Sequence, residues 1–321
     1  MKKYIGAALA VICSCGFSFA AVMSGDVVSI FNLNNAAESI SSFTWSSSGD
    51  LYVLTGDASW GMDMNVYKND SHSSVYNGAA WVGASILSVG NYIYFNASTF
   101  TDYPLYKYDT AGGGASSEVL NYEYSYAFAG YGNGIYFSAG NSSYSGTTLY
   151  YCPVGIGGNL GAAVAISEEF AGASGPVAFD AAGNLYYGSG VGSEVYKFSA
   201  ADVSAAVAGT VMDDLASYLY FDAVSYGYAG ATGMDVDADG NLVVSLTSWG
   251  GDSVLVSYDG TDSSIIASSD SRISRVVNRN GQLFFNDAEG IYQVVPEPVS
   301  VLLILCGALG VAGYRRMFAN V

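Results

Sequence analysis

The 321-residue chain is poor in basic residues and has a single histidine. Lysine and arginine together number 10 against 28 aspartates and glutamates, which gives a formal net charge of -18. Four of the ten basic residues, Lys2, Lys3, Arg315 and Arg316, lie at the two ends of the chain. An acidic body of this kind repels phosphate backbones, so we expect no nucleic-acid partner. The lone histidine, His72, excludes a metal centre built from several histidines and argues against a histidine-based catalytic triad.

Cysteine is also scarce. Cys13 and Cys15 lie in an N-terminal apolar run and Cys306 lies in a C-terminal one, which leaves Cys152 alone in the body. No disulfide framework is therefore expected within the body, and its stability must come from packing. Cys152 lies in an aromatic, strand-like stretch, so we expect a buried packing residue rather than a nucleophile.

Glycine and tyrosine are abundant, at 40 and 27 residues, whereas charged residues make up only 12%. Hydrophobic residues reach 51%, enough for a substantial core. This mixture is typical of many short strands joined by tight turns. Without its two ends the chain has roughly 275 residues, which suits one large β domain or two small ones.

The N-terminus has the pattern of a secretory signal peptide. Lys2 and Lys3 precede a mostly apolar stretch over residues 5–19, and Ser18 and Ala20 supply small residues at the -3 and -1 positions of a cleavage site. We therefore predict a signal peptide over residues 1–20, followed by an exported body. The alternatives are an uncleaved anchor helix and a lipoprotein signal around Cys15.

The C-terminus combines an apolar stretch with a basic end. Residues 299–314, 16 positions, carry no charge, and Arg315 and Arg316 follow directly. As a helix this segment would be about 24 Å long, slightly short for a bilayer core. Arginines after such a segment hold the tail on the cytoplasmic side. The pattern predicts one transmembrane helix over residues 299–314, with the body outside the cytoplasm.

A short proline-containing motif stands before this stretch. It comprises Val295, Pro296, Glu297 and Pro298. With the apolar stretch and the arginine pair, it resembles the PEP-CTERM sorting tail, here over residues 295–321. The resemblance implies an exosortase-like membrane protease as partner and a Gram-negative bacterium that makes exopolysaccharide. Two prolines disfavour regular helix and leave an accessible segment, so cleavage near residues 296–298 would release the body. The alternative is an ordinary C-terminal membrane anchor with a proline-rich stalk.

The body, residues 21–294, contains a recurring phrase of a glycine turn followed by an apolar and aromatic strand. Its six copies are GDLYVL, GNYIYF, GNGIYF, GNLYYG, GNLVVS and GQLFFN, which start at Gly49, Gly90, Gly132, Gly183, Gly240 and Gly281. Successive copies lie 41, 42, 51, 57 and 41 residues apart, and each is followed by a second strand-like phrase. Repeats of three or four short strands at this period are typical of β-propeller blades.

We therefore predict an all-β fold, a β-propeller with six blades, and the pattern resembles NHL, SMP-30 and YncE-type propellers. The segment from Asp26 to Asn34 has no hairpin of its own, so we expect it to be the outer strand of the last blade and to close the ring. A seven-bladed ring and an open sandwich are the alternatives. Ser199 and Asp202 have the spacing of a capping box and predict a short surface helix in the longest interval.

One acidic turn has two interpretations. Asp235, Asp237 and Asp239 alternate ahead of Gly240, as in calcium-binding loops. However, Leu246 stands where an EF-hand loop would have glutamate, and the matching stretch from Asp180 to Asn184 contains one aspartate. The segment is therefore either a plain hairpin turn or a Ca²⁺ site, and we expect no other cofactor.

Two further sets of residues were considered as a site. The pairs Glu168–Glu169 and Asp213–Asp214 are adjacent in sequence, and no pattern places them across a cleft. The stretch from Asn121 to Phe128 alternates tyrosines, whose rings could either hold sugars by their apolar faces or pack between sheets. The sequence thus favours a binding or structural module associated with exopolysaccharide. A polysaccharide-active lyase or hydrolase is the alternative, although the lack of basic clusters and histidines argues against it.

Overall fold

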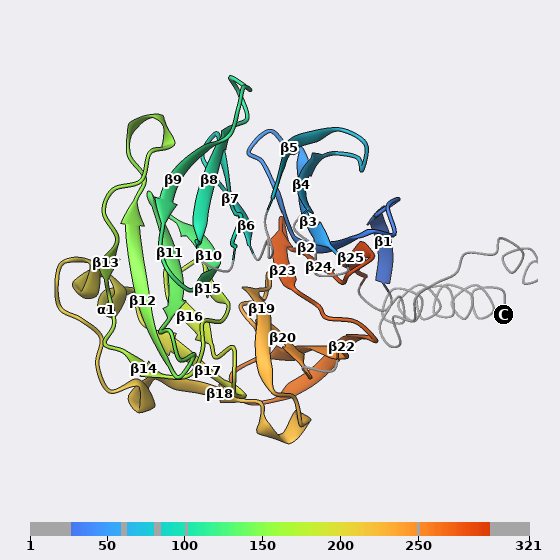
Figure 1. Ribbon diagram of the computed structural model, residues 1–321. Coiled ribbons are helices and arrows are strands. Elements are labelled where there is room, and N and C mark those ends of the chain that lie inside the picture. Colours follow the sequence, from blue (N-terminus) through green and yellow to red (C-terminus); the bar gives the residue numbers. More distant parts are fainter. Residues whose placement is uncertain (1–26, 59–62, 80–84, 100–101, 249–250, 296–321) are drawn as a thin grey trace, which may run out of the picture.

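The computed structural model describes residues 27–58, 63–79, 85–99, 102–248 and 251–295. These residues form six antiparallel sheets, arranged as blades around a central axis (Figure 1). The fold is therefore all-β and a six-bladed propeller, as the six repeats predict, and neither the seven-bladed ring nor the open sandwich is found.

The first three blades follow each other along the chain. The first consists of β2 (Glu38–Trp45), β3 (Leu51–Asp57), β4 (Asp63–Lys68) and β5 (Ser74–Ala79). The second consists of β6 (Ile86–Val89), β7 (Tyr92–Asn96), β8 (Pro104–Asp109) and β9 (Ser117–Asn121). The third consists of β10 (Ser125–Tyr131), β11 (Gly134–Gly140), β12 (Gly146–Pro153), β13 (Val164–Ala165) and β14 (Phe170–Ala171).

The remaining blades repeat the same order. The fourth consists of β15 (Val177–Phe179), β16 (Leu185–Gly188), β17 (Glu194–Phe198) and β18 (Leu219–Asp222). The fifth consists of β19 (Gly230–Val236), β20 (Leu242–Thr247), β21 (Ser253–Tyr258) and β22 (Ser263–Ser269). The sixth consists of β23 (Arg275–Arg279), β24 (Gln282–Asn286), β25 (Gly290–Val294) and β1 (Val27–Asn32).

The ring closes through β1. This strand pairs antiparallel with β25, with Val27 opposite Val294 and Phe31 opposite Ile291. The prediction that the segment from Asp26 to Asn34 completes the last blade is confirmed for the residues of β1. The innermost strands also contact one another in an unbroken circle, through the pairs β2–β6, β6–β10, β10–β15, β15–β19, β19–β23 and β23–β2.

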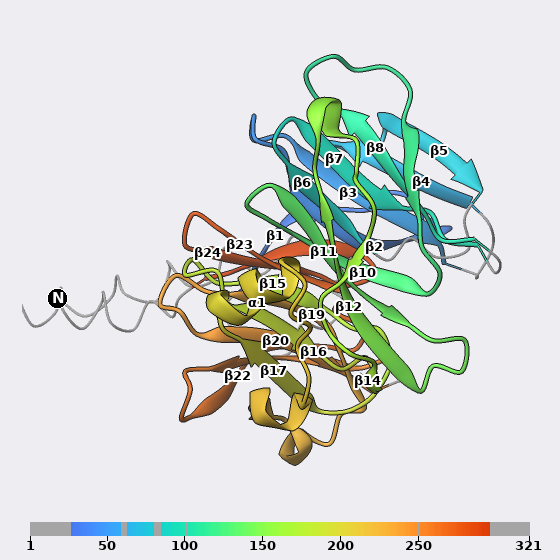
Figure 2. The same ribbon diagram turned by 90° about the vertical axis from the view of Figure 1, so that its left-hand side faces the viewer.

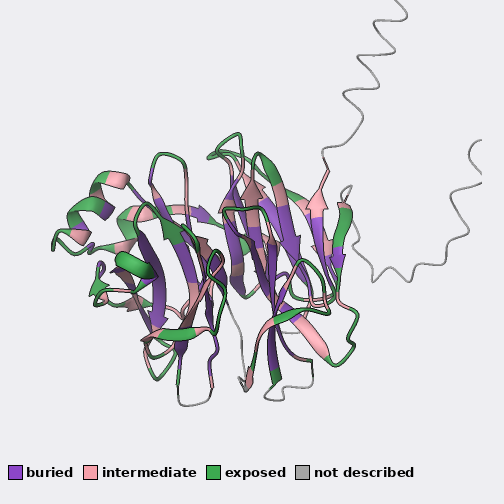
Figure 3. Ribbon diagram, turned by 90° about the horizontal axis from the view of Figure 1, so that it is seen from above, coloured by how far each residue is buried: buried purple, intermediate pink, exposed green. Residues whose placement is uncertain are grey.

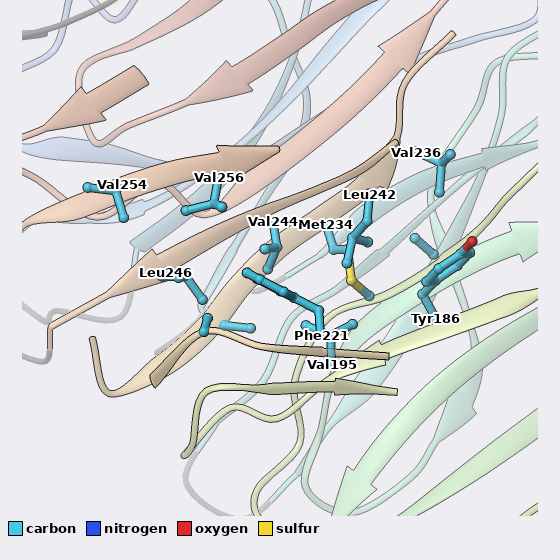
Figure 4. Packing of buried hydrophobic residues seen from close by; sticks show 13 residues of the cluster. Tyr186, Val195, Phe221, Met234, Val236, Leu242, Val244, Leu246, Val254 and Val256 are labelled. Atoms are coloured by element: carbon cyan, nitrogen blue, oxygen red, sulfur yellow. The ribbon is translucent and has the colours of Figure 1, made fainter. Parts of the chain in front are cut away.

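Apolar side chains fill the space between neighbouring blades. Six separate clusters of buried residues occur, one at each of the six junctions. Figure 4 shows the cluster between the fourth and fifth blades, where Tyr186 and Phe221 face Met234 and Val244. Strands such as β3 are buried on both faces because each sheet lies between two others. Buried positions accordingly concentrate in the strands and exposed ones in the connections (Figure 3).

Short helices lie in the two longest intervals between repeats. The α-helix α1 (Ala200–Val207) begins after Ser199, whose hydroxyl accepts a hydrogen bond from the Asp202 backbone, as the capping pattern predicts. It lies outside the ring beside β13, and Figure 2 views it from that side. Three 3₁₀ turns complete the helical elements of the described residues: η1 (Ile156–Gly158), η2 (Leu215–Tyr218) and η3 (Val224–Tyr226).

The expected signal peptide over residues 1–20 lies outside the described residues. So does the expected sorting tail over 295–321 apart from Val295, including the expected transmembrane helix over 299–314. Within the ranges that are described, no helix has the length and apolar character needed to span a membrane.

Candidate functional site

A shallow pocket lies at the axis of the ring, where four of the innermost strands begin. We call this end of the propeller the inner-strand face. The pocket has a volume of about 70 Å³. The third to sixth blades each contribute lining residues, including Tyr126, Ser174, Pro176, Ala231, Thr232 and Arg272. Pockets that enclose a whole small ligand are several times larger, so only a protruding group could enter this one.

Arg272 is the only charged residue of this lining, and its guanidinium forms no hydrogen bond or ion pair within the described part of the chain. Arg272 is exposed, although the surrounding protein partly desolvates its guanidinium and lowers its pKa. The group stays charged at neutral pH because a guanidinium is not deprotonated under such conditions. A positively charged hydrogen-bond donor without an acceptor among the described residues therefore lies at the pocket.

The other cations of the body show how unusual this is. Lys68 forms an ion pair of 3.0 Å with Asp50, and Lys107 donates to the Gly157 carbonyl. Lys197 and Arg279 lie over aromatic rings, the latter 4.7 Å from the centroid of Trp45. Among the described basic residues, Arg272 and Arg275 are therefore the two without such a partner.

The hydroxyl groups of the pocket already have partners within the protein. The Ser174 hydroxyl interacts with the hydroxyl of Ser138 at 2.8 Å, and the Thr232 hydroxyl donates to the Ile273 carbonyl at 2.6 Å. These bonds join neighbouring blades and hold the wall of the pocket rigid. They leave Arg272 as the side chain best able to bind a ligand there.

A cluster of four tyrosines adjoins the pocket through Tyr126. Tyr103 lies 5.1 Å from Tyr124 and 5.5 Å from Tyr126 between ring centroids, and Tyr124 lies 5.4 Å from Tyr144. Tyr103 is buried, whereas 52% of Tyr144 is exposed. The cluster thus runs from the axis to the surface and joins the second and third blades.

Two of these tyrosines adopt an unusual backbone conformation. Tyr124 and Tyr144 have φ angles of 55° and 53°. Bulky residues rarely occupy this left-handed region, and such strain concentrates at binding and catalytic sites.

The hydroxyls of Tyr103 and Tyr126 are neutral at physiological pH. Burial raises the pKa of Tyr126 well above its usual value, and hydrogen bonds with Tyr103 and Tyr144 add to the shift. Burial likewise raises the pKa of Tyr103. These groups can donate hydrogen bonds and offer apolar ring faces, but they are not bases.

The alternating stretch from Asn121 to Phe128 therefore divides into two parts. Tyr122 packs between strands, 5.3 Å from Phe137 and 4.6 Å from Tyr150. Tyr124 and Tyr126 instead belong to the cluster on the inner-strand face. The packing interpretation is confirmed for Tyr122, whereas sugar binding by the other rings stays a prediction.

The two acidic pairs border a single depression. Glu168, Glu169, Asp213 and Asp214 line a pocket of about 80 Å³ at the outside of the third and fourth blades. The Glu168 amide donates to the Met212 carbonyl, which brings the two segments together. All four carboxylates are exposed, as expected for solvated loops. That they share one depression could not be predicted from their positions in the sequence.

The three aspartates of the acidic turn do not converge. Asp237 accepts hydrogen bonds from the amides of Asp239 and Asn241 and so organises its own hairpin turn. Asp239 is exposed, whereas Asp235 turns to the sixth blade and accepts from the Asn278 amide at 2.6 Å. In the described ranges, no three histidine, cysteine, aspartate or glutamate side chains are placed to hold a metal ion. The Ca²⁺ site stays a prediction that a calcium titration would test.

Among the described carboxylates, Asp235 has an unusually high pKa. Burial raises its pKa to about 6, while hydrogen bonds from the backbone of Asn278 and Val236 and the charge of Arg275 act against the shift. The Nε of Arg275 is itself buried and lacks a hydrogen-bond partner among the described residues. A buried charge pair thus lies between β19 and β23 without direct ion pairing.

Two other residues singled out in the sequence are not part of a site. Cys152 is fully buried, and burial raises its pKa to about 11, so it is not a thiolate at neutral pH. His72 lies exposed in the turn between β4 and β5. Both agree with the expectations for these residues. Arg272, in contrast, had no local sequence signal beyond being one of six basic residues in the body.

Comparison with known proteins shows the fold and no family. No protein family and no curated protein sequence matches the chain. Among solved structures, it is similar to virginiamycin B lyase from Staphylococcus aureus, with 8% identity and a TM-score of 0.53 over 84% of this chain and 98% of that one. A gluconolactonase from Xanthomonas campestris has 12% identity and a TM-score of 0.54 over 85% and 90%. A luciferin-regenerating enzyme has 11% and 0.51 over 85% and 96%. At such identities these similarities establish the propeller fold alone.

Proposed function

We propose that the protein is an exported binding module of the cell envelope whose inner-strand face holds a glycan of an exopolysaccharide layer. The observation that carries this proposal is the tyrosine cluster of Tyr103, Tyr124, Tyr126 and Tyr144. Aromatic side chains bind the apolar faces of sugars. The rigid propeller holds these side chains in place, so binding costs little conformational entropy. The exposed ring of Tyr144 offers the first contact surface.

The delivery of the body is part of the same proposal. The PEP-CTERM-like tail, with Pro296, Pro298, Arg315 and Arg316, would bring the exported chain to the inner membrane. There an exosortase-like protease would cleave near residues 296–298 and release the body to the envelope or the medium. The support for this step is the order of the three sequence features, motif, apolar stretch and arginine pair.

Binding is tested with a glycan array and the full-length protein. Retention of polysaccharide by the unaltered protein, reduced by Tyr144→Ala but not by Tyr122→Ala, supports the proposal, because Tyr122 packs at the junction of the second and third blades. A reducing-sugar assay on the bound glycans runs in parallel. Turnover that disappears on a single carboxylate substitution would replace the binding module with the alternative, a polysaccharide lyase or hydrolase.

Sorting is tested by expression in an exosortase-containing host and in its exosortase deletion. We expect a shortened chain outside the inner membrane in the first strain and a full-length, membrane-held chain in the second. The double substitution Pro296→Ala and Pro298→Ala should reproduce the deletion result. Identical length and location in both strains would reduce the tail to an ordinary anchor.

A further inference from the structure

The axial pocket offers chemistry that the tyrosine cluster lacks. A glycan-binding surface needs only rings and neutral hydrogen-bond donors, yet this one adjoins Arg272, a charged side chain without a partner in the described residues. Arg272 is exposed to solvent and lines the pocket together with Tyr126, so an anionic group of a ligand can reach its guanidinium.

We propose that Arg272 binds a carboxylate of an acidic glycan while the sugar ring rests on the tyrosine cluster. The inference rests on the proposed function and names its substrate class, a polysaccharide that contains uronic acids or similarly carboxylated sugars. The planar guanidinium matches a carboxylate with two parallel hydrogen bonds, which makes such pairs strong and directional.

The size of the pocket fits this assignment. A volume of about 70 Å³ admits a carboxylate but not a hexose ring, so the ring must stay at the mouth. Tyr126 lines the pocket and also contacts Tyr103, so it connects the two halves of the site. A sugar acid has two matching parts, a ring with an apolar face and a charged carboxylate that projects from it.

The surroundings favour an anion at this position. The hydroxyls of Ser174 and Thr232 bond within the protein, so the guanidinium is the free donor of the wall. Arg275 lies three residues further along the chain, and its buried Nε also lacks a hydrogen-bond partner among the described residues. Asp235 compensates part of the charge of Arg275, whereas no carboxylate in the described ranges forms an ion pair with Arg272.

The test is calorimetric titration of the full-length protein with three probes: trigalacturonate, D-galacturonate and neutral maltotriose. We expect trigalacturonate to bind, and added salt to weaken it. Arg272→Gln should weaken binding at least about tenfold, the usual range for a lost hydrogen bond to a charged group. Arg272→Lys should give an intermediate loss of affinity, because lysine keeps the charge but lacks the two parallel N–H donors of the guanidinium.

Arg279→Gln is the matched control. It removes the same charge from the same blade, but Arg279 lies over Trp45 at the opposite end of β23. We expect affinity within about twofold of the unaltered protein. Thermal unfolding of each variant, followed by circular dichroism, shows whether a loss of binding reflects a loss of fold.

The outcomes separate this inference from the proposed function. Maltotriose and trigalacturonate binding equally, with no effect of Arg272→Gln, would overturn the anion site and leave glycan binding intact. D-galacturonate binding through Arg272 without any oligosaccharide or array signal would keep the anion site and remove the glycan-binding function. Binding of none of the three probes by the folded protein would overturn both.

Discussion

Single buried polar residues connect the blades. Ser245 and Asn286 end the recurring strand phrase in two repeats, Asn96 and Ser138 directly follow it in two others, and all four are fully buried. Each forms a hydrogen bond with the backbone that begins the next blade; Asn286, for example, donates to the Ile40 carbonyl at 3.1 Å. Such residues fix the spacing between sheets, which apolar contacts alone do not specify.

Asn286→Ala should therefore destabilise the ring. The substitution removes two donated bonds and leaves the Ile40 carbonyl without that partner in the core. We expect a loss of about 1–3 kcal/mol in the free energy of unfolding, measured with urea. Asn133→Ala, in an exposed turn, is the matched control and should stay within about 0.5 kcal/mol. Equal effects would show that the junction contributes nothing.

Asp235 should make stability depend on pH. Its pKa of about 6 exceeds the ordinary value of 3.8 for an aspartate, so folding favours the protonated form. The stabilisation is complete below about pH 4 and is lost as the pH rises to about 6, by at most about 3 kcal/mol. We expect the difference in unfolding free energy between the unaltered protein and Asp235→Asn to fall over this window and then level off.

The control for this pH dependence is Asp239→Asn, which removes the same charge from the exposed turn that follows. Urea unfolding at pH 4, 5, 6 and 7 gives the comparison. If both substitutions produce the same pH profile, the burial of Asp235 is not the cause.

Hairpins show how far the sequence determines individual elements. The stretches from Asp180 to Asn184 and from Asp237 to Asn241 form the same turn, in which the aspartate accepts from the amides two and four residues later. Gly183 and Gly240 have φ angles of 87° and 88°, as the glycine turns predict. These features are local, so they could be predicted. The contact of Asp235 with the next blade depends on a residue 43 positions away and could not.

Ser199→Ala should weaken α1 selectively. The hydroxyl satisfies the Asp202 amide at the start of the helix, and loss of such a cap costs about 1 kcal/mol. Ser204→Ala, an exposed position inside the same helix, should be neutral or slightly stabilising because alanine has the higher helix propensity. Urea unfolding of both variants measures the difference. A cost at Ser204 equal to that at Ser199 would contradict the capping role.

At the scale of the whole molecule, the sequence repeats determine the six-bladed ring, whereas the candidate site is assembled from residues of several blades. Six copies of the glycine-turn phrase, 41 to 57 residues apart, predict six blades. The segment before them, which has no hairpin of its own, predicts the closing strand. The alternating stretch from Asn121 to Phe128 pointed to Tyr124 and Tyr126 as candidates. Arg272 and Tyr103 escaped prediction because they lie on other blades and come near Tyr126 only at the axis or beside it. Their sequence neighbours carry no shared motif. The propeller must therefore be closed before these residues can form a site, because an open ring would separate them.

Phe31→Ala tests that closure. Phe31 is the buried residue of β1 and packs at the junction of the sixth and first blades, with Phe43 and Phe284 in the same cluster. We expect a loss of about 2–4 kcal/mol and a lower urea midpoint for the ring as a whole, because opening one junction exposes two sheets. Ile30→Ala changes the neighbouring position of the same strand, which is 40% exposed, and should cost much less. A main transition that is unchanged in Phe31→Ala would mean that β1 is an appendage and that β25 holds the ring without it.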